Sequence, residues 1–315
     1  MSSHRHRQSR WPLIVVAGLM VHIAAAAIVA HGASPAAVEL KVMSFNVRYS
    51  HGGMDEARTE NNWTDPKYPR RERAIRVIRK KMPDVLGVQE ARELQVVDLR
   101  KALPEFEFYG VGRDDGKTGG EYAGIFYRKD RFDRTDAGSF WLSATPAKPG
   151  TSFYSAPGAV PRMASWVRLR DKTSGKELLV LNTHWDHISA PARKQSAALI
   201  RARLSKLGKG LPAIVMGDLN GAEESPEVAE LIGTPDSPDR QLTDSYRKLH
   251  PQRLPEESTF NDWKGTIAGS RIDFILHTEE FTPTAAAILR TNYGGRWPSD
   301  HYPITATLWL ESDAE

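Results

Sequence analysis

The chain has 315 residues, 40% of them hydrophobic and 26% charged, which is enough for one large globular domain or two smaller ones. It contains no cysteine, so disulfides, thiolate zinc sites and a cysteine nucleophile are excluded. The 43 Lys and Arg residues exceed the 39 Asp and Glu residues by four, and three of the arginines lie within the first ten residues. Without those three, the single remaining positive charge gives no general basic surface of the kind that binds nucleic acid.

The N-terminal segment differs in composition from the rest of the chain. Arg5, Arg7 and Arg10 precede an apolar run over residues 11–30, no acidic residue is present, and small residues follow the run. This pattern is typical of a secretory leader, which we assign to residues 1–33. The alternative is an uncleaved membrane anchor, because the run is nearly long enough to span a bilayer. Both interpretations predict an exported domain, which is periplasmic or secreted in the first case and attached to the membrane in the second.

From residue 38 onward, strand-like and helix-like patterns follow one another. We predict strands over 38–47, 84–91, 122–128, 165–170, 177–185, 212–220, 271–277 and 302–310, and helices over 70–81, 94–103 and 190–207. This mixed order favours an α/β sandwich in which two sheets pack together with helices outside. No linker-like stretch divides it, so residues 34–315 are assigned to one domain. Long irregular segments over 51–69, 140–163 and 248–270 are candidates for functional loops.

Polar side chains recur where the apolar runs begin or end. They are Asn46, Glu90, Asn182, His184, Asp218, Asn220, Asp273, Asp300 and His301. In a sandwich such strand ends can converge on one rim and form a cleft. Carboxylate and amide oxygens of this kind suit Mg²⁺, or Mn²⁺ as an alternative. The sequence HWDH over 184–187 also suggests a zinc site, but no third histidine lies nearby in the sequence.

Six segments in a fixed order resemble the motifs of a known superfamily. They read MSFNVRY, DVLGVQE, LNTHWDH, IVMGDLNG, RIDFIL and SDHYPITATL, and the resemblance extends over about residues 39–310. In this order they are similar to the motif set of the endonuclease/exonuclease/phosphatase superfamily. The resemblance implies a four-layer α/β/β/α sandwich with two packed mixed sheets. It also implies metal-dependent hydrolysis of phosphoesters.

The resemblance implies a metal site built on Glu90. Glu90 is expected to be the principal Mg²⁺ ligand, with Asn46 beside it. Asp300 is expected either to bind the metal or to position a water molecule. The structural alternatives are a solvent-exposed carboxylate for Glu90 and a turn-forming role for Asn46.

The catalytic residues implied by the resemblance come from the later motifs. Asp218 is expected to be the general base or to position the attacking water, with Asn220 facing the same phosphate. His184 is expected to contact the phosphate or to assist the leaving group. His301 is expected to contact the scissile phosphate, while Asp273 fixes its tautomer and supports its positive charge.

Three further residues are candidates for contacts to the substrate phosphate. Arg48 and Arg193 can donate paired hydrogen bonds to phosphate oxygens, and a surface position without a ligand is the alternative for each. Asn182, at the end of the predicted strand 177–185, completes this group.

The sequence therefore predicts an exported Mg²⁺-dependent enzyme that hydrolyses phosphodiester bonds in RNA, DNA or nucleotides. A phosphomonoesterase acting on inositol or sugar phosphates and a sphingomyelinase-like phospholipid hydrolase are the alternatives. A binding protein with an inactive site is the alternative from another class. No protein partner is indicated. Aromatic residues of the long segments are expected to set specificity or to pack those segments: Trp63, Tyr68, Trp141, Phe153, Tyr154 and Trp263.

Overall fold

The computed structural model describes residue 1 and residues 38–50, 61–234 and 240–310; the predicted leader, apart from residue 1, lies outside these ranges. Two six-stranded sheets form the centre of the domain. The first has the strand order β11-β12-β1-β2-β4-β3 and the second has the order β5-β6-β7-β8-β10-β9. Both sheets are mixed, because β1 pairs with β2 and β7 pairs with β8 in parallel while the other pairs are antiparallel.

The elements have the following bounds. The first sheet contains β1 (Val38–Asn46), β2 (Val85–Ala91), β3 (Phe106–Tyr109), β4 (Tyr122–Arg128), β11 (Phe281–Ile288) and β12 (Ile304–Leu310). The second contains β5 (Phe132–Trp141), β6 (Met163–Asp171), β7 (Glu177–His184), β8 (Ala213–Asp218), β9 (Thr243–Asp244) and β10 (Asp273–His277). The helices are α1 (Arg70–Lys81), α2 (Glu93–Ala102), α3 (Ala190–Gly208), α4 (Pro226–Ile232) and α5 (Ser245–Leu249). Across the described ranges, no helix combines the length and the apolar character that crossing a bilayer requires.

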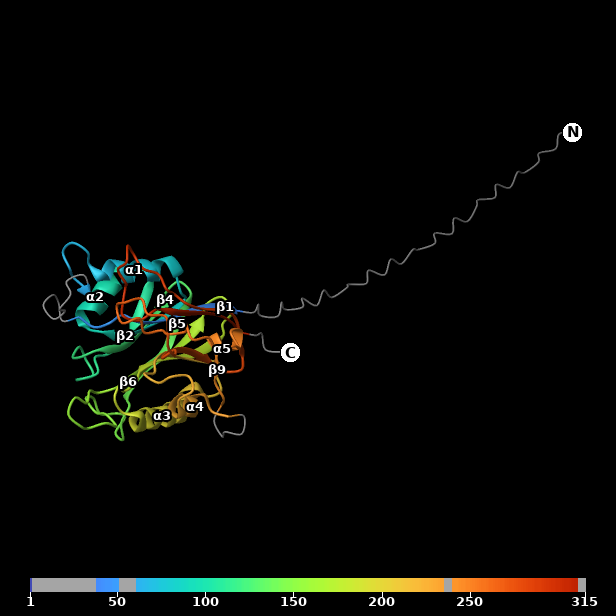
Figure 1. Cartoon of the computed structure of the whole chain (residues 1–315). Helices are drawn as coiled ribbons and strands as arrows, with labels where there is room; N and C mark the ends of the chain where they lie inside the picture. Colours follow the sequence, from blue (N-terminus) through green and yellow to red (C-terminus); the bar gives the residue numbers. More distant parts are fainter. Residues whose placement is uncertain (2–37, 51–60, 235–239, 311–315) are drawn as a thin grey trace. The chain divides into compact units, whose positions relative to one another are not determined.

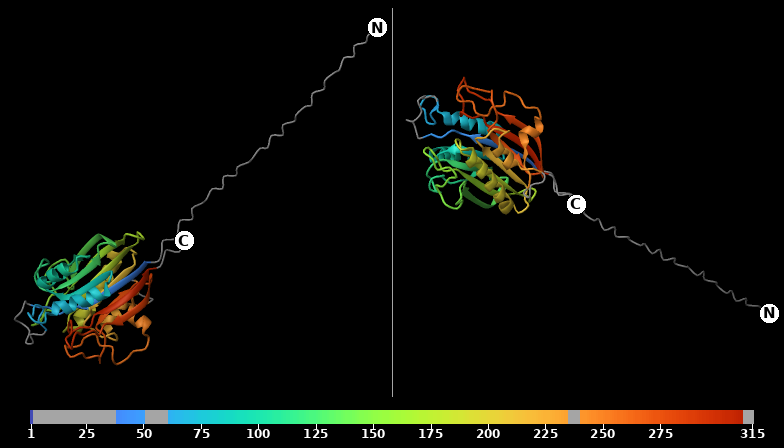
Figure 2. Two further views of the ribbon diagram at one scale, coloured as in Figure 1. Left: turned by 90° about the horizontal axis from the view of Figure 1, so that it is seen from above. Right: turned by 60° about the horizontal axis from the view of Figure 1, so that its bottom comes forward.

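The sheets pack face to face, and helices cover their outer faces (Figure 1). Helices α1 and α2 cover the first sheet, and α3 and α4 cover the second. The predicted four-layer sandwich is therefore confirmed. Figure 2 shows the C-terminal strands beside β1, where β12 pairs antiparallel with β1 across seven residues.

Strand β1 shows how the sequence specifies the layers. Leu40 and Val42 point into the core between the two sheets, whereas Met43 and Phe45 enter the core beneath α1 and α2. Because both faces of the strand are covered, its second half is an almost continuous apolar run rather than an alternating one. All four side chains are at most 1% exposed. The run ends at Asn46, which is the first polar side chain on the rim.

An ionic network fixes the segment that follows β8. Arg271 donates to Glu223 and to Asp244, both over 2.6 Å, and Arg247 donates to Glu223 over 2.8 Å and also pairs with Glu257. Burial raises the pKa of Glu223, but hydrogen bonds from Arg247 and Arg271 outweigh burial and lower this pKa to about 2. The network thus ties the residues after Asp218 to the strand that carries Asp273.

We expect Glu223→Gln to lower the free energy of unfolding at pH 7 by about 3 kcal/mol, because two largely buried arginines lose a charged partner. The pKa of Glu223 is lower in the folded chain than its ordinary value of 4.5. Its ionisation therefore stabilises the fold fully above that pH, and this contribution disappears as the pH falls towards 2. Urea unfolding of parent and variant at pH 7 and at pH 3 measures the difference.

The neighbouring Glu224→Gln is the matched control, since Glu224 is exposed and lies outside the arginine pairs. Its effect should stay within about 0.5 kcal/mol at both pH values. A Glu223→Gln penalty that is as large at pH 3 as at pH 7 would contradict the ionic origin of the stabilisation.

Candidate active site

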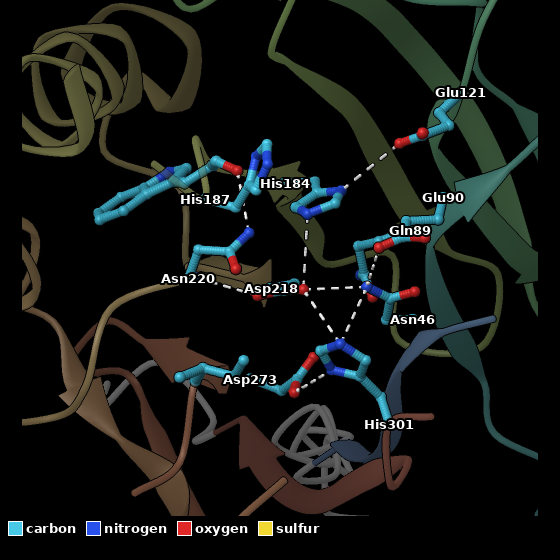
Figure 3. Close-up of polar contacts among 12 residues, drawn as sticks. Asn46, Gln89, Glu90, Glu121, His184, His187, Asp218, Asn220, Asp273 and His301 are labelled. Carbon is cyan, nitrogen blue, oxygen red and sulfur yellow. Dashed lines mark hydrogen bonds and ion pairs between the residues drawn. The ribbon is translucent and has the colours of Figure 1, made fainter. Parts of the chain in front are cut away.

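The ends of strands from both sheets meet at one rim of the sandwich (Figure 3). Strands β1 and β2 contribute from the first sheet, and β7, β8 and β10 contribute from the second. The polar side chains brought together there are Asn46, Glu90, His184, Asp218, Asp273 and His301. Each of them is at most 7% exposed. The predicted convergence of strand ends is therefore present in the fold.

Asn46 links the two sheets at this rim. Its amide nitrogen donates to Glu90 Oε1 over 3.0 Å and to Asp218 Oδ2 over 2.9 Å. Its amide oxygen accepts from the backbone N–H of Arg48 over 3.0 Å. Asn46 thus presents its nitrogen, and not its oxygen, to the carboxylates in this structure, and its predicted role as a metal ligand stays a prediction.

The backbone around Glu90 is strained in a way that directs its carboxylate into the site. Glu90 has a φ of 61° and lies where the β2–β4 pairing shifts register. A non-glycine residue rarely adopts this left-handed conformation, and such strain concentrates at functional sites. Arg48, with a φ of 52°, lies 3.4 Å from Glu90 Oε2. Burial alone would raise the pKa of Glu90, but the charge of Arg48 and the hydrogen bond from Asn46 outweigh burial and lower this pKa below its ordinary value. The carboxylate is therefore ionised.

Asp218 occupies the centre of the rim and is 1% exposed. Burial and the neighbouring Asp273 carboxylate raise the pKa of Asp218 to about 7. His184 Nε2 lies 3.5 Å from Asp218 Oδ2. Burial, together with the positive charge of Arg162, lowers the pKa of His184 well below its ordinary value, so this imidazole is neutral. A general base works best with a pKa close to the working pH, and the pKa of Asp218 is close to it when no cation is bound.

His301 and Asp273 form a hydrogen-bonded pair. His301 Nδ1 lies 2.9 Å from Asp273 Oδ2, and His301 Nε2 lies 3.7 Å from Asp218 Oδ2. Burial lowers the pKa of His301, but the Asp273 and Asp218 carboxylates outweigh it and raise this pKa to about 10. The imidazole is therefore positively charged at neutral pH, with both ring nitrogens protonated. This geometry is the one expected if Asp273 orients and charges His301.

Among the residues that the structure describes, two groups of side chains have ligand atoms close enough to share a metal ion. Glu90, His184 and Asp218 offer atoms within 4.8 Å of one another, as do Asp218, Asp273 and His301. The second group contains the protonated His301, which has no lone pair for a metal. The first group contains an ionised carboxylate, a neutral imidazole and a second carboxylate, and it fits a divalent cation such as Mg²⁺ or Mn²⁺.

Asp300 lies beside this group without joining it. It accepts a hydrogen bond from the Ser299 hydroxyl over 3.2 Å and lies 3.5 Å from Arg48 Nε. Burial raises its pKa, although the positive charges of His301 and Arg48 oppose the shift. Its placement next to Arg48 makes it part of the charge balance around Glu90, and its predicted metal role stays a prediction.

Asn182 requires a correction. It is fully buried, and its amide nitrogen donates to the backbone oxygens of Val88 and Gly124 over 2.9 and 2.8 Å. Its oxygen accepts from Gln89 over 2.6 Å. A Cβ at Gly87, on the facing sheet, would lie 2.9 Å from the Asn182 side chain. The side chain therefore braces the two sheets beneath the cleft and does not reach a substrate phosphate.

Arg193 is not brought together with the other predicted residues. Its Nε donates to Glu227 over 2.7 Å, and its Nη1 donates to the backbone oxygen of Asp186 over 3.1 Å. It does not line the cleft, in contrast to Arg48.

Asn220, with a φ of 46°, donates from its side chain to the backbone oxygen of Trp185 over 3.1 Å and lines the cleft.

The rim opens into a cleft of about 670 Å³. Several of its lining residues were not predicted from the sequence: Arg92, Arg113, Glu121, Arg162, His187 and Phe260. Arg113 donates twice to Glu121, over 2.6 and 2.9 Å, and burial raises the pKa of Glu121 to about 7 despite that partner. Arg162 is only 5% exposed, and within the described ranges its Nε and Nη1 have no hydrogen-bond partner.

Two of the predicted aromatic residues, Trp63 and Trp141, have structural roles. Trp63 is fully buried and donates to Asp98, while Trp141 is 5% exposed and donates to the backbone oxygen of Arg113. The exposed aromatic side chain of the cleft is instead Phe260, which is 39% exposed and packs edge-on against His301 with 5.2 Å between ring centroids.

Comparison with known proteins agrees with this geometry. The model of the endonuclease/exonuclease/phosphatase family matches residues 43–301. The chain belongs to this family. Members of the family are hydrolases that act on phosphoesters and typically depend on a divalent metal. The predicted family is thus confirmed, and the chain is a phosphoesterase of this family.

Solved structures of bacterial relatives match this chain over almost their whole length. A family protein from Bacteroides thetaiotaomicron is 33% identical, with a TM-score of 0.76, and the match covers 88% of this chain and 99% of that one. A mannosyl-6-phosphatase from the same organism is 34% identical, with a TM-score of 0.74, and the match covers 85% of this chain and 99% of that one. The human nocturnin catalytic domain shares the fold at 17% identity, with a TM-score of 0.63 over 86% of this chain and 93% of that one. Comparison with curated proteins gives no match.

The pair formed by His301 and Asp273 predicts non-additive effects of mutation. We expect His301→Ala to lower kcat/KM by about 10³-fold and Asp273→Asn by a smaller factor, while the double variant is scarcely worse than His301→Ala alone. The reason is that Asp273 has no imidazole left to orient once His301 is removed. A double-mutant cycle on kcat/KM measures the coupling, with circular dichroism to confirm folding.

His250→Ala serves as the control in the same cycle, because His250 stacks on Tyr246 outside the cleft. The loss of kcat/KM in the His250→Ala, Asp273→Asn double variant should equal the product of the two single losses. If the losses from His301→Ala and Asp273→Asn also multiply, the two residues act independently and the pairing has no catalytic role.

Proposed function

We propose that the protein is a divalent-metal-dependent phosphomonoesterase that hydrolyses phosphate esters of small polyhydroxylated alcohols such as sugars. The observation that carries the proposal is Arg162, a nearly buried guanidinium in the cleft wall, two of whose nitrogens have no hydrogen-bond partner among the described residues. A terminal phosphate has three non-bridging oxygens and carries up to two negative charges, so it requires more donors and more positive charge than a phosphodiester. Arg162 supplies both beside His184.

Two further observations support a small substrate. The cleft volume of about 670 Å³ lies in the range of sites that hold small ligands. The mannosyl-6-phosphatase relative matches this chain at 34% identity over 85% of its length. The nocturnin catalytic domain, at 17% identity, shares only the fold and carries no argument about substrate. The phosphodiester specificity predicted from the sequence has no comparable support and is tested below.

The residues of the rim can hydrolyse a phosphate ester by attack of a water molecule on phosphorus. Glu90, with His184 and Asp218, would hold the divalent cation, which supplies Lewis-acid stabilisation of charge on the phosphate oxygens. Asp218 accepts a proton from the attacking water as the water oxygen bonds to phosphorus and the ester P–O bond breaks. The protonated His301 gives a proton to the leaving alcohol oxygen and can regain it from Asp218, whose Oδ2 lies 3.7 Å from His301 Nε2. The protonated His301 and Arg162 donate N–H groups to phosphate oxygens, where charge accumulates in the transition state.

Export of the enzyme is a second part of the proposal. It is supported by the arginine-rich start of the chain and the apolar run over residues 11–30, which are typical of a secretory leader or an N-terminal anchor. Under either reading, the phosphoesterase domain acts outside the cytoplasm, and the two differ in whether residues 11–30 stay attached to it.

The proposal predicts the substrate range. With Mg²⁺ or Mn²⁺, mannose 6-phosphate and p-nitrophenyl phosphate should be hydrolysed at least about tenfold faster than bis-p-nitrophenyl phosphate, RNA or single-stranded DNA. EDTA should abolish all activity, and added Mg²⁺ should restore it. The measurement is released phosphate or p-nitrophenol under initial-rate conditions.

Asp218→Asn, which retains shape but cannot accept the proton, is the control for contaminating phosphatases and should be nearly inactive on every substrate. Preference for the diester substrates would instead support the nuclease-type specificity. Full activity after the metal has been stripped would contradict the metal-dependent mechanism.

A further inference from the structure

The loop between β7 and α3 is fixed by contacts that are unusual for an exposed connection. Asp186 is 2% exposed, and its Oδ1 accepts from the backbone N–H groups of Ile188 and Ser189 over 2.8 and 2.6 Å. Arg193 donates to the backbone oxygen of Asp186 while it is held by Glu227. The loop is therefore anchored to α3 and, through Glu227, to α4. This explains the placement of Arg193, which acts on the loop rather than on phosphate.

This loop carries His187 to the edge of the cleft. The His187 side chain is exposed and lines the cleft, and Figure 3 shows it on the same side of the site as His184 and Asn220. Asn220 binds the backbone of the same loop through the oxygen of Trp185 over 3.1 Å. The hydrogen bond from Asn220 thus helps to fix the position of the loop that carries His187.

Arg162 determines which ring nitrogen of His187 carries the proton. Arg162 Nη2 lies 2.9 Å from His187 Nδ1. A guanidinium can only donate, so Nδ1 must accept, and the proton of the neutral imidazole must be on Nε2. Burial and the charge of Arg162 both lower the pKa of His187, which agrees with a neutral ring. His187 therefore offers an N–H donor of fixed tautomer, on a loop that is already ordered.

We propose that His187 is a specificity-determining residue whose Nε2–H donates to an oxygen of the alcohol portion of the substrate, with Arg162 holding its tautomer. This inference rests on the proposed phosphomonoesterase function and names the part of the substrate that the site recognises. In mannose 6-phosphate the ring oxygen on C5 and the hydroxyl on C4 lie two and three carbons from the ester oxygen, and both accept hydrogen bonds. An aryl phosphate has only carbon there.

The chemistry of the pair favours such a substrate. A donor that is positioned in advance loses little conformational entropy when it binds, and a site built to bond a substrate oxygen discriminates strongly against an analogue that lacks it. His187 needs no negative charge on its partner because it is neutral, so a hydroxyl or ring oxygen suffices. The adjacent Arg162 remains available for the phosphate.

The test compares two substrates in three variants of the full chain with Mg²⁺ present. The ratio of kcat/KM for mannose 6-phosphate to kcat/KM for p-nitrophenyl phosphate is measured for the parent, His187→Ala and His187→Gln. We expect His187→Ala to lower this ratio at least about tenfold, mainly through the KM for the sugar phosphate. His187→Gln, whose amide N–H can take the place of Nε2–H, should recover part of the loss.

Ile188→Ala is the matched control, because Ile188 is 49% exposed on the same loop and does not line the cleft. It should leave the ratio at the parental value. Equal losses on both substrates in His187→Ala, or an unchanged ratio, would overturn the assignment of His187. A parent enzyme that hydrolyses no sugar phosphate but cleaves diesters would instead overturn the proposed function, and with it the inference.

Discussion

The two hydrogen bonds from the Asn46 amide are the interaction on which the site depends. They join Glu90 on the first sheet to Asp218 on the second, over 3.0 and 2.9 Å, at the rim where the sheets meet. Both carboxylates are buried, and burying like charges together is unfavourable unless donors or cations compensate. The Asn46 donors, Arg48 and the charged His301 supply part of this compensation, and a divalent cation would supply more. The charge balance of the rim thus favours a bound divalent cation there.

This arrangement lowers local stability, and the rest of the domain offsets it. Arg48, Glu90 and Asn220 adopt left-handed backbone conformations at the rim, and each such conformation costs on the order of 1 kcal/mol or more. The apolar layers on both sides of each sheet and the ionic network around Glu223 and Arg271 hold these residues in place. Strain at the site is therefore maintained by regular packing beneath it.

The sequence predicted the central strands, because their apolar runs are long and both faces are covered, and the three longest helices, because their apolar residues recur at helical spacing. It did not predict β3, β5, β9 and β11, and these are the edge strands of the two sheets. Edge strands are short, polar or interrupted: the middle of β5 is exposed, and β11 contains Pro283. Their periodicity is too weak to separate them from loops without knowledge of their partners.

The same limit explains which site residues could be predicted. Side chains at the beginnings and ends of apolar runs were found because a polar residue marks the limit of such a run. Arg162 was not found, because it lies in the long irregular segment 140–163 and borders no predicted strand. It reaches the rim only because β6 runs antiparallel to β7 and pairs Met163 with His184. Asn182 lies two residues before His184 on β7, and its side chain is buried between the sheets instead of reaching the rim. The sequence does not show how far from the rim a strand residue lies.

The central claim is that Glu90 and Asp218, held together across the sheets by Asn46, form one binding site for a divalent cation. Isothermal titration of the apo protein with Mn²⁺ tests it directly, with Glu90→Gln as the variant and the exposed Glu39→Gln as its control. Parent and control should bind Mn²⁺ with the same affinity, whereas Glu90→Gln should remain folded and bind at least about tenfold more weakly. Unchanged Mn²⁺ affinity in a folded Glu90→Gln protein would contradict the claim.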